Sequence, residues 1–280
     1  MSFFKGRIVA IATKHQKETA IAPILENELG LQCITPTGID TDTLGTFTGE
    51  VKREDDIIAT LRKKCMMAME VSGLDLAVAS EGSFGAHPSS FFAQADDELI
   101  MLFDKKNNIE IIERELSLET NFSASEINSV ENLLDFAQKV GYPSHGIILK
   151  RAKNDFAGII KENKTLDELV ANYHIIKNAA NLAFAETDMR AMNNPTRMKV
   201  IAKATQRLVQ KIKSTCPACS TPGFGVVESQ KGLPCEVCGL PTKSTLKHVY
   251  RCQKCNYQQE KRYPYDKKTE NPQFCDFCNP

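Results

Sequence analysis

Eight of the ten cysteines of this 280-residue chain lie in its last 65 residues, as four Cys-x-x-Cys knuckles. In chain order, knuckles one to four are Cys216/Cys219, Cys235/Cys238, Cys252/Cys255 and Cys275/Cys278. Two thiolates of one tight turn can reach the same tetrahedral ion, and two knuckles complete a four-thiolate site. The pattern therefore predicts two zinc ions in a small C-terminal zinc-ribbon module. Because four thiolates leave no open coordination position, we expect both ions to stabilise the fold rather than to carry out chemistry.

Two other interpretations of the knuckles are a disulfide framework, which suits a secreted chain, and an iron–sulfur site, which uses the same ligand. The first residues run into a strand-like segment, 7–12, without the cationic region, long apolar stretch and cleavage site of an export signal. No stretch approaches the roughly 20 apolar residues of a membrane span. We therefore expect a soluble, cytoplasmic protein with reduced thiols, which favours zinc.

The sequence leaves open which knuckles share an ion. Strand-like runs at 224–227 and 246–251 suit the hairpins of zinc ribbons, and the segment 235–255 resembles a self-contained ribbon. This favours one ion between knuckles two and three, with knuckles one and four closing around them. Sequential and cross-braced pairings are the alternatives.

In front of the module, residues 1–214 alternate strand-like and helical patterns, which predicts an α/β body with a mixed sheet and flanking helices. We expect residues 215–280 to form the module. Strands are expected at 7–12, 31–34, 74–79 and 146–150, a loop at 80–88, and a hairpin of 99–103 with 109–112. Helices are expected around 21–29, 58–69, 130–140, 166–176 and 195–213, the last with Asn194 as its cap and Pro195 as its first residue.

Polar residues gather after the expected strands, where open α/β sheets place their ligand crevice. The carboxylates that could hold a hard cation such as Mg²⁺ are Glu81, Glu119, Glu186 and Asp188. The cations that could hold phosphate are Lys14, Lys17, Arg190 and Arg197. Together they predict a metal-assisted hydrolase acting on a nucleotide or another phosphorylated small molecule. The alternative is that these groups cap helices and form surface ion pairs; the polar segment 186–197 fits that alternative least.

The last expected helix carries a basic stripe, and no acidic residue occurs from 189 to 214. Its members recur every four residues: Lys199, Lys203, Arg207 and Lys211. This face is a candidate for phosphate backbones and suggests a second function, a nucleic-acid or protein adaptor that also uses the zinc module. A solvated helix face is the plainer interpretation.

Two segments carry a resemblance over nearly the whole chain: Glu186-Thr-Asp-Met-Arg with Asn194-Pro-Thr-Arg-Met, and the terminal Cys275-Asp-Phe-Cys-Asn-Pro. The chain resembles an uncharacterised bacterial domain-of-unknown-function family that combines this body with the cysteine tail. The resemblance implies no activity.

A more distant similarity covers residues 7–120. Thr13-x-x-x-Lys17, Gly45-Thr-Phe47 and Glu81-Gly82 are similar to motifs of inosine and xanthosine triphosphate pyrophosphatases. That family implies magnesium-dependent hydrolysis of a nucleoside triphosphate, with Lys17 near phosphate and Glu81 near the metal. Three positions depart from its pattern: Lys14 replaces an asparagine, Ser83 replaces a glycine, and the acidic partner around Glu50 is out of register.

Overall fold

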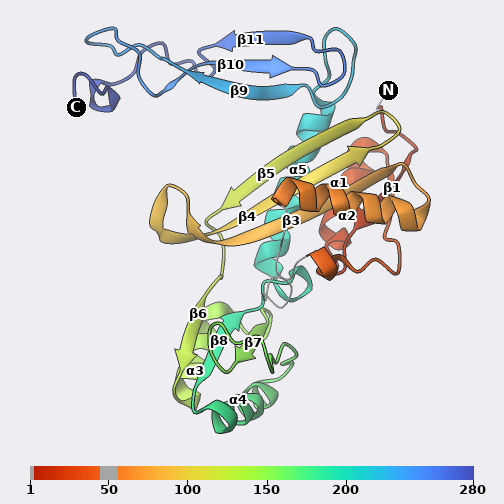
Figure 1. Cartoon of the computed structure of the whole chain (residues 1–280), viewed down its shortest axis with the longest axis vertical. Coiled ribbons are helices and arrows are strands. Elements are labelled where there is room, and N and C mark those ends of the chain that lie inside the picture. Colours follow the sequence, from red (N-terminus) through yellow and green to blue (C-terminus); the bar gives the residue numbers. More distant parts are fainter. Residues whose placement is uncertain (1–2, 45–55) are drawn as a thin grey trace. The chain divides into compact units, whose positions relative to one another are not determined.

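The computed structural model describes residues 3–44 and 56–280, apart from the side chains of Asp42 and Phe91. Gly45, Phe47 and Glu50, which entered the second resemblance, lie outside the described residues. The chain divides into two compact units, Met1–Val209 and Gln210–Pro280 (Figure 1). Within the described ranges, no helix has the length and apolar character needed to cross a membrane.

The first unit contains a five-stranded sheet in the order β2-β1-β3-β4-β5. β1 is parallel to both of its neighbours, whereas β4 is antiparallel to β3 and β5. The strands are β1 Ile8–Ala12, β2 Gln32–Ile34, β3 Leu76–His87, β4 Ser90–Asp104 and β5 Ile109–Ser117. Between them lie the helices α1 Glu18–Leu29 and α2 Ile57–Ser72 and the 3-10 turn η1 Thr41–Leu44. The expected α/β body with a mixed sheet is confirmed.

β3 is longer than the sequence predicts, and the expected loop at 80–88 is wrong. The strand continues to His87 and pairs with β4 in an unbroken register from Leu76 to Ala86. Full burial ends at Glu81, so the apolar run stops while the backbone pairing goes on. Two glycines, Gly82 and Gly85, add to the loop-like appearance of this half of the strand.

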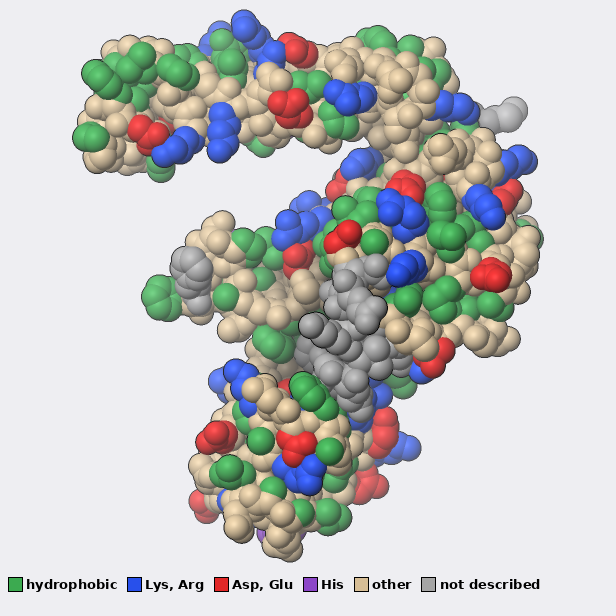
Figure 2. Space-filling model, viewed as in Figure 1, with side chains coloured by type: hydrophobic (Ala, Val, Ile, Leu, Met, Phe, Trp, Pro, Cys, Tyr) green, Lys and Arg blue, Asp and Glu red, His purple; other side chains and the backbone are tan. Residues whose placement is uncertain are grey.

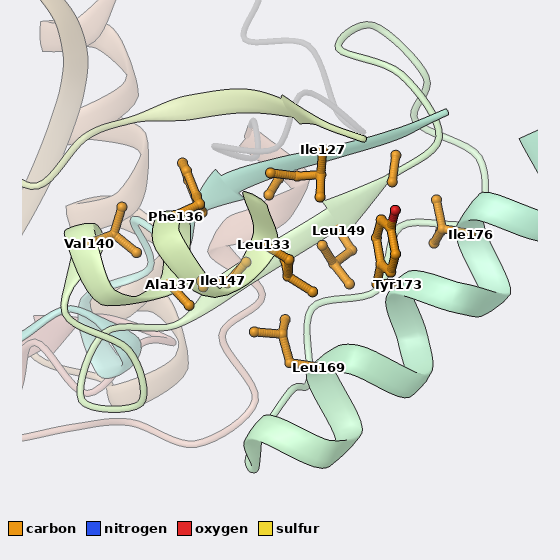
Figure 3. Packing of buried hydrophobic residues seen from close by; sticks show 12 residues of the cluster. Ile127, Leu133, Phe136, Ala137, Val140, Ile147, Leu149, Leu169, Tyr173 and Ile176 are labelled. Atoms are coloured by element: carbon orange, nitrogen blue, oxygen red, sulfur yellow. The ribbon is translucent and has the colours of Figure 1, made fainter. Parts of the chain in front are cut away.

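A second, smaller antiparallel sheet in the same unit has the order β6-β8-β7. Its strands are β6 Ala124–Ile127, β7 Ile147–Lys150 and β8 Ala183–Thr187, and α3 Val130–Val140 and α4 Leu166–Ala180 accompany them. Figure 3 shows side chains of both helices meeting those of the strands in one apolar core, among them Leu133, Leu149 and Tyr173. Ser129 caps α3, and Thr165 forms a capping box with Glu168 on α4.

Helix α5, Pro195–Lys213, follows the 3-10 turn η2 Ala191–Asn193 and begins as the sequence predicts. The Asn194 side chain accepts a hydrogen bond from the Arg197 backbone N–H at 2.9 Å, as an N-cap should. Arg197 and Arg207 form ion pairs with Glu98 of β4 and Glu115 of β5. These pairs tie α5 to the first sheet.

The second unit is a three-stranded antiparallel sheet in the order β11-β10-β9, flanked by the knuckles. The strands are β9 Gly225–Lys231, β10 Thr245–Arg251 and β11 Gln258–Arg262, and a short turn, η3 Pro272–Phe274, follows. Most positions of β9 and all of β11 are exposed. A core cluster consists of Cys216, Phe224 and Cys252 with Tyr250 against it. So small a cluster of buried apolar side chains contributes little to the stability of the unit. Other interactions must therefore hold the unit together.

Candidate metal centres and a buried charged cluster

The eight knuckle cysteines form two four-sulfur sets, and within each set all Sγ atoms lie within 4.8 Å of one another. Site one consists of Cys216, Cys219, Cys252 and Cys255, and site two of Cys235, Cys238, Cys275 and Cys278. Within each set, the sulfur–sulfur distances between the two knuckles run from 3.6 to 3.9 Å. Four sulfurs around a zinc ion at 2.3 Å would be about 3.8 Å apart, so the side chains already have the spacing of a loaded tetrahedral site.

The observed pairing is cross-braced, and the favoured pairing of knuckles two and three is wrong. β9 and β10 are antiparallel, with Gly225 opposite Arg251 and Lys231 opposite Thr245. Knuckle one precedes β9 and knuckle three follows β10, so both lie at the same end of the sheet. Knuckle two follows β9, and β11 brings the chain back toward knuckle four at the other end. Antiparallel pairing therefore dictates which knuckles meet.

Both sites offer sulfur ligands alone, and each has two cysteines buried and two at least partly exposed. Secondary contacts hold the sulfurs of site one: the Lys254 N–H donates to Cys252 Sγ at 3.4 Å, and Cys219 Sγ lies 3.1 Å from Thr221 Oγ1. Such second-layer hydrogen bonds orient metal ligands. A set of four thiolates closes the coordination sphere, so the two sites can hold two structural metal ions.

The first unit contains a buried charged cluster of six side chains, which come from β3, β4, α2, α5 and the residue before α1. Its members are Lys17, Lys64, Glu81, Asp96, Glu98 and Arg197, all buried. Glu81 lies opposite Leu99, on the side of the sheet where α2 packs, and accepts from Lys64 Nζ at 2.5 Å. Glu98 lies opposite Gly82, so its side chain projects from the other side.

On that other side, Arg197 Nε donates to Glu98 Oε1 at 2.5 Å, and its guanidinium lies 5.0 Å from the Phe84 ring centroid. Lys17 Nζ donates to the backbone oxygen and the hydroxyl of Ser80 at 2.9 and 3.1 Å. Burial, with the neighbouring Arg197, lowers the pKa of Lys17 to about 7. Burial and the nearby Glu98 raise the pKa of Asp96 to about 8.

The structure places the residues predicted from the sequence in separate groups. Lys17, Glu81 and Arg197 belong to the buried charged cluster. Glu186 pairs with Lys150 at 2.6 Å, and Asp188 pairs with Arg190 at 2.7 Å, both around β8. Lys14 pairs with Asp40 and Glu119 with Lys203, in largely exposed positions. The metal-assisted phosphoryl site built from all eight residues stays a prediction.

The basic stripe of α5 is partly neutralised. Lys203 Nζ lies 2.8 Å from Glu119, and Arg207 Nε lies 2.6 Å from Glu115. Both acids lie outside α5. The helix sequence alone, which has no acidic residue, therefore did not show that acidic side chains surround part of the stripe.

Sequence reasoning missed three members of the charged cluster, Lys64, Asp96 and Glu98. A signal for the two acids existed: Asp96, Glu98 and the core residue Ile100 alternate on one face of β4. Extending the predicted hairpin backward at period two would have placed both carboxylates on a buried face.

No curated protein sequence matches the chain. A family model described as "Domain of unknown function (DUF6671)" matches residues 64–280, which include most of the first unit and the whole cysteine module. The similarity to nucleoside triphosphate pyrophosphatases receives no support from these comparisons. On this match the chain belongs to the DUF6671 family, a domain of unknown function.

Proposed function

We propose that this protein is a zinc-stabilised binding protein whose C-terminal unit is held by two Zn²⁺ ions. The observation that carries the proposal is the arrangement of eight Sγ atoms in two tetrahedron-sized sets at opposite ends of one sheet. Soft thiolates in a tetrahedral set suit zinc or iron. X-ray absorption at the zinc edge should give four sulfurs at about 2.3 Å, whereas iron in the sites would contradict the zinc assignment.

The sheet of this unit carries a row of aromatic rings, which we take as its contact surface. The rings are Tyr265, His248, Tyr250, Phe224 and Tyr257, and the centroids of successive rings lie 5.4 to 6.4 Å apart. His248 and Tyr250 alternate on β10 and therefore share one face, and Lys261 of β11 lies opposite His248. Tyr265 at one end of the row is 69% exposed, and Tyr257 at the other end is 38% exposed.

Single-stranded nucleic acid is the partner that such a row fits best. Every base has a π-face, and stacking on an aromatic side chain is worth about 1–3 kcal/mol per base. Charge contributes less, because nine Lys/Arg face six Asp/Glu from Cys216 onward and the thiolates with their ions add about −4. On the face of this unit that Figure 2 shows, blue and red side chains are interspersed rather than gathered in one basic patch.

Fluorescence anisotropy with labelled single-stranded oligonucleotides tests the proposal. Tyr265→Ala and Tyr257→Ala should each weaken binding by about 5- to 150-fold, the equivalent of one lost stack. Phe277→Ala removes an exposed ring outside the row and is the matched control. Log affinity should fall only shallowly with log salt, with a slope of about −1 to −2. Absence of binding at low salt, or equal loss in all three variants, would contradict the proposal.

A second candidate is the magnesium-dependent hydrolysis of a nucleotide or another phosphorylated small molecule by the first unit. What supports it is the burial of Lys17 and Arg197 near Glu81, since buried cations suit phosphate. It predicts magnesium-dependent release of phosphate or pyrophosphate from a nucleotide panel, lost in Glu81→Gln with an unchanged circular dichroism spectrum. A panel with no turnover and no ligand-induced thermal shift would contradict it.

A further inference from the structure

Two carboxylates of β4 are buried side by side on one face of the first sheet. Asp96 and Glu98 are two positions apart on the strand, so their side chains project to the same side. Both side chains are 0% exposed. Their neighbours across the strand pair are Phe84 and Gly82.

The oxygens of these carboxylates are incompletely satisfied. Both Asp96 oxygens and Glu98 Oε2 are buried and have no hydrogen-bond partner within residues 3–44 and 56–280. The two nearby cations bond to other groups: Lys17 Nζ donates to Ser80, and Arg197 donates to Glu98 Oε1 and the Met189 carbonyl. Buried polar groups are normally paired, and an unpaired buried carboxylate is costly. Within the residues that the structure describes, no cation donates a hydrogen bond to these three oxygens, although Arg197 is bonded to the other oxygen of Glu98.

On the neighbouring strand β3, Gly82 leaves room for the Glu98 and Arg197 side chains. A Cβ atom at Gly82 would lie 2.3 Å from Glu98 Oε1 and 2.6 Å from Arg197 Nη2. A glycine at this strand position allows the Glu98–Arg197 pair to lie directly against β3. The pair in turn fixes the Glu98 carboxylate and leaves its second oxygen, Oε2, available.

We propose that Asp96 and Glu98 bind a hard divalent cation, Mg²⁺ or Mn²⁺, through the Asp96 oxygens and Glu98 Oε2. Carboxylate oxygens are the ligands that these ions prefer, and Mg²⁺ commonly uses one or two carboxylates and completes its octahedron with water or ligand oxygens. The site differs in ligand chemistry from the cysteine sites, which favour softer ions. It stands independently of the zinc and nucleic-acid proposals.

Titration of the zinc-loaded full-length chain with Mn²⁺ at pH 7.5 tests the site, with free Mn²⁺ followed by electron paramagnetic resonance. Prior zinc loading keeps the cysteine sites out of the measurement. The wild-type chain should show one saturable site, and Asp96→Asn should weaken it at least tenfold. Asp97→Asn is the matched control, because Asp97 lies on the opposite face and pairs with Arg114 at 2.6 Å. Its affinity should equal that of the wild type.

Thermal unfolding in zinc-containing buffer provides a second readout. Without Mg²⁺, Asp96→Asn should unfold at the same temperature as the wild type or higher, because it removes an unpaired buried carboxylate. Added Mg²⁺ should raise the unfolding temperature of the wild type and leave that of Asp96→Asn unchanged. The inference is overturned by a wild-type chain without saturable Mn²⁺ binding, or by an Asp96→Asn variant that binds as tightly as the wild type.

Discussion

At the scale of single residues, Gly82 is the position where β3 and the buried charged cluster meet. Gly82→Ala places a Cβ 2.3 Å from Glu98 Oε1 and should push apart the Glu98–Arg197 pair. Overpacking of this kind typically costs about 1–3 kcal/mol. Urea unfolding of the variant should show this loss in the free energy of unfolding.

Gly85→Ala is the control for that experiment. It lies on the same strand, and a Cβ there would meet nothing within 4 Å. Alanine suits a strand better than glycine, so this variant should be as stable as the wild type or slightly more stable. Equal stability of the two variants would contradict the tight approach at Gly82.

Asp104 gives a prediction for pH. It is fully buried, and Arg7 donates two hydrogen bonds to it, at 2.5 and 3.0 Å. Burial alone would raise the pKa of Asp104, but the hydrogen bonds from Arg7 and Asn107 outweigh burial and lower it. A lowered folded-state pKa contributes stability that is complete above the unfolded value of about 3.9 and is lost as pH falls through the folded value.

The stability advantage of the wild type over Asp104→Asn should therefore be constant above about pH 5 and shrink below about pH 4. Urea unfolding of both proteins from pH 6 to pH 3 measures this difference, in which the acid sensitivity of the zinc sites cancels. Asp75→Asn, which removes the half-exposed partner of the same Arg7, should show a smaller change. An advantage that persists unchanged at pH 3 would rule out the lowered pKa.

At the scale of elements, the sheet β9–β10–β11 determines which cysteines share an ion, and double variants test this. Cys219→Ser with Cys255→Ser damages site one alone, so the chain should retain roughly one zinc ion. Cys219→Ser with Cys238→Ser damages both sites and should retain almost none. Zinc analysis of the two purified variants measures the outcome.

Other pairings give other results. If knuckles one and two shared an ion, the zinc contents of the two double variants would be reversed. If knuckles two and three shared an ion, both variants would lose nearly all their zinc. The assay thus distinguishes all three arrangements that the sequence left open.

Helices and strands that are determined by residues close together in the sequence were predictable. The helical pattern over 58–69 predicted α2, and Asn194 with Pro195 predicted the start of α5. The end of β3 was not predictable from an apolar run, because β3 leaves the core at Glu81 while its hydrogen bonds to β4 continue. Three polar or exposed strands, β6, β9 and β11, are defined mainly by their partners, and their full extent needed the tertiary structure.

In the candidate sites too, features determined by local sequence were predictable, and features determined by tertiary structure were not. Cys-x-x-Cys spacing fixes two ligands locally, so all eight cysteines could be named from the sequence. Their pairing depends on strand direction and could not. The carboxylates predicted after the strands could be named from the sequence, but their ion-pair partners could not. These partners lie far along the chain: Lys64 pairs with Glu81, and Lys150 pairs with Glu186.

At the scale of the whole molecule, the two units obtain their stability from different sources. The first unit has apolar cores between helices and two sheets, such as the cluster around Leu133 and Leu149. The second unit has a largely exposed sheet between two four-sulfur sites. The free energy of metal binding contributes directly to the folding free energy of such a unit. Removal of the ions should therefore unfold the second unit and leave the first one folded.

The central claim is that two zinc ions hold the second unit, and metal analysis of the full-length chain purified without chelators tests it most directly. The account predicts two zinc ions per chain and eight thiols that react with a thiol reagent only after the ions are removed. A chain that contains no zinc, with all eight of these thiols reacting freely and β9–β11 still folded, would contradict it.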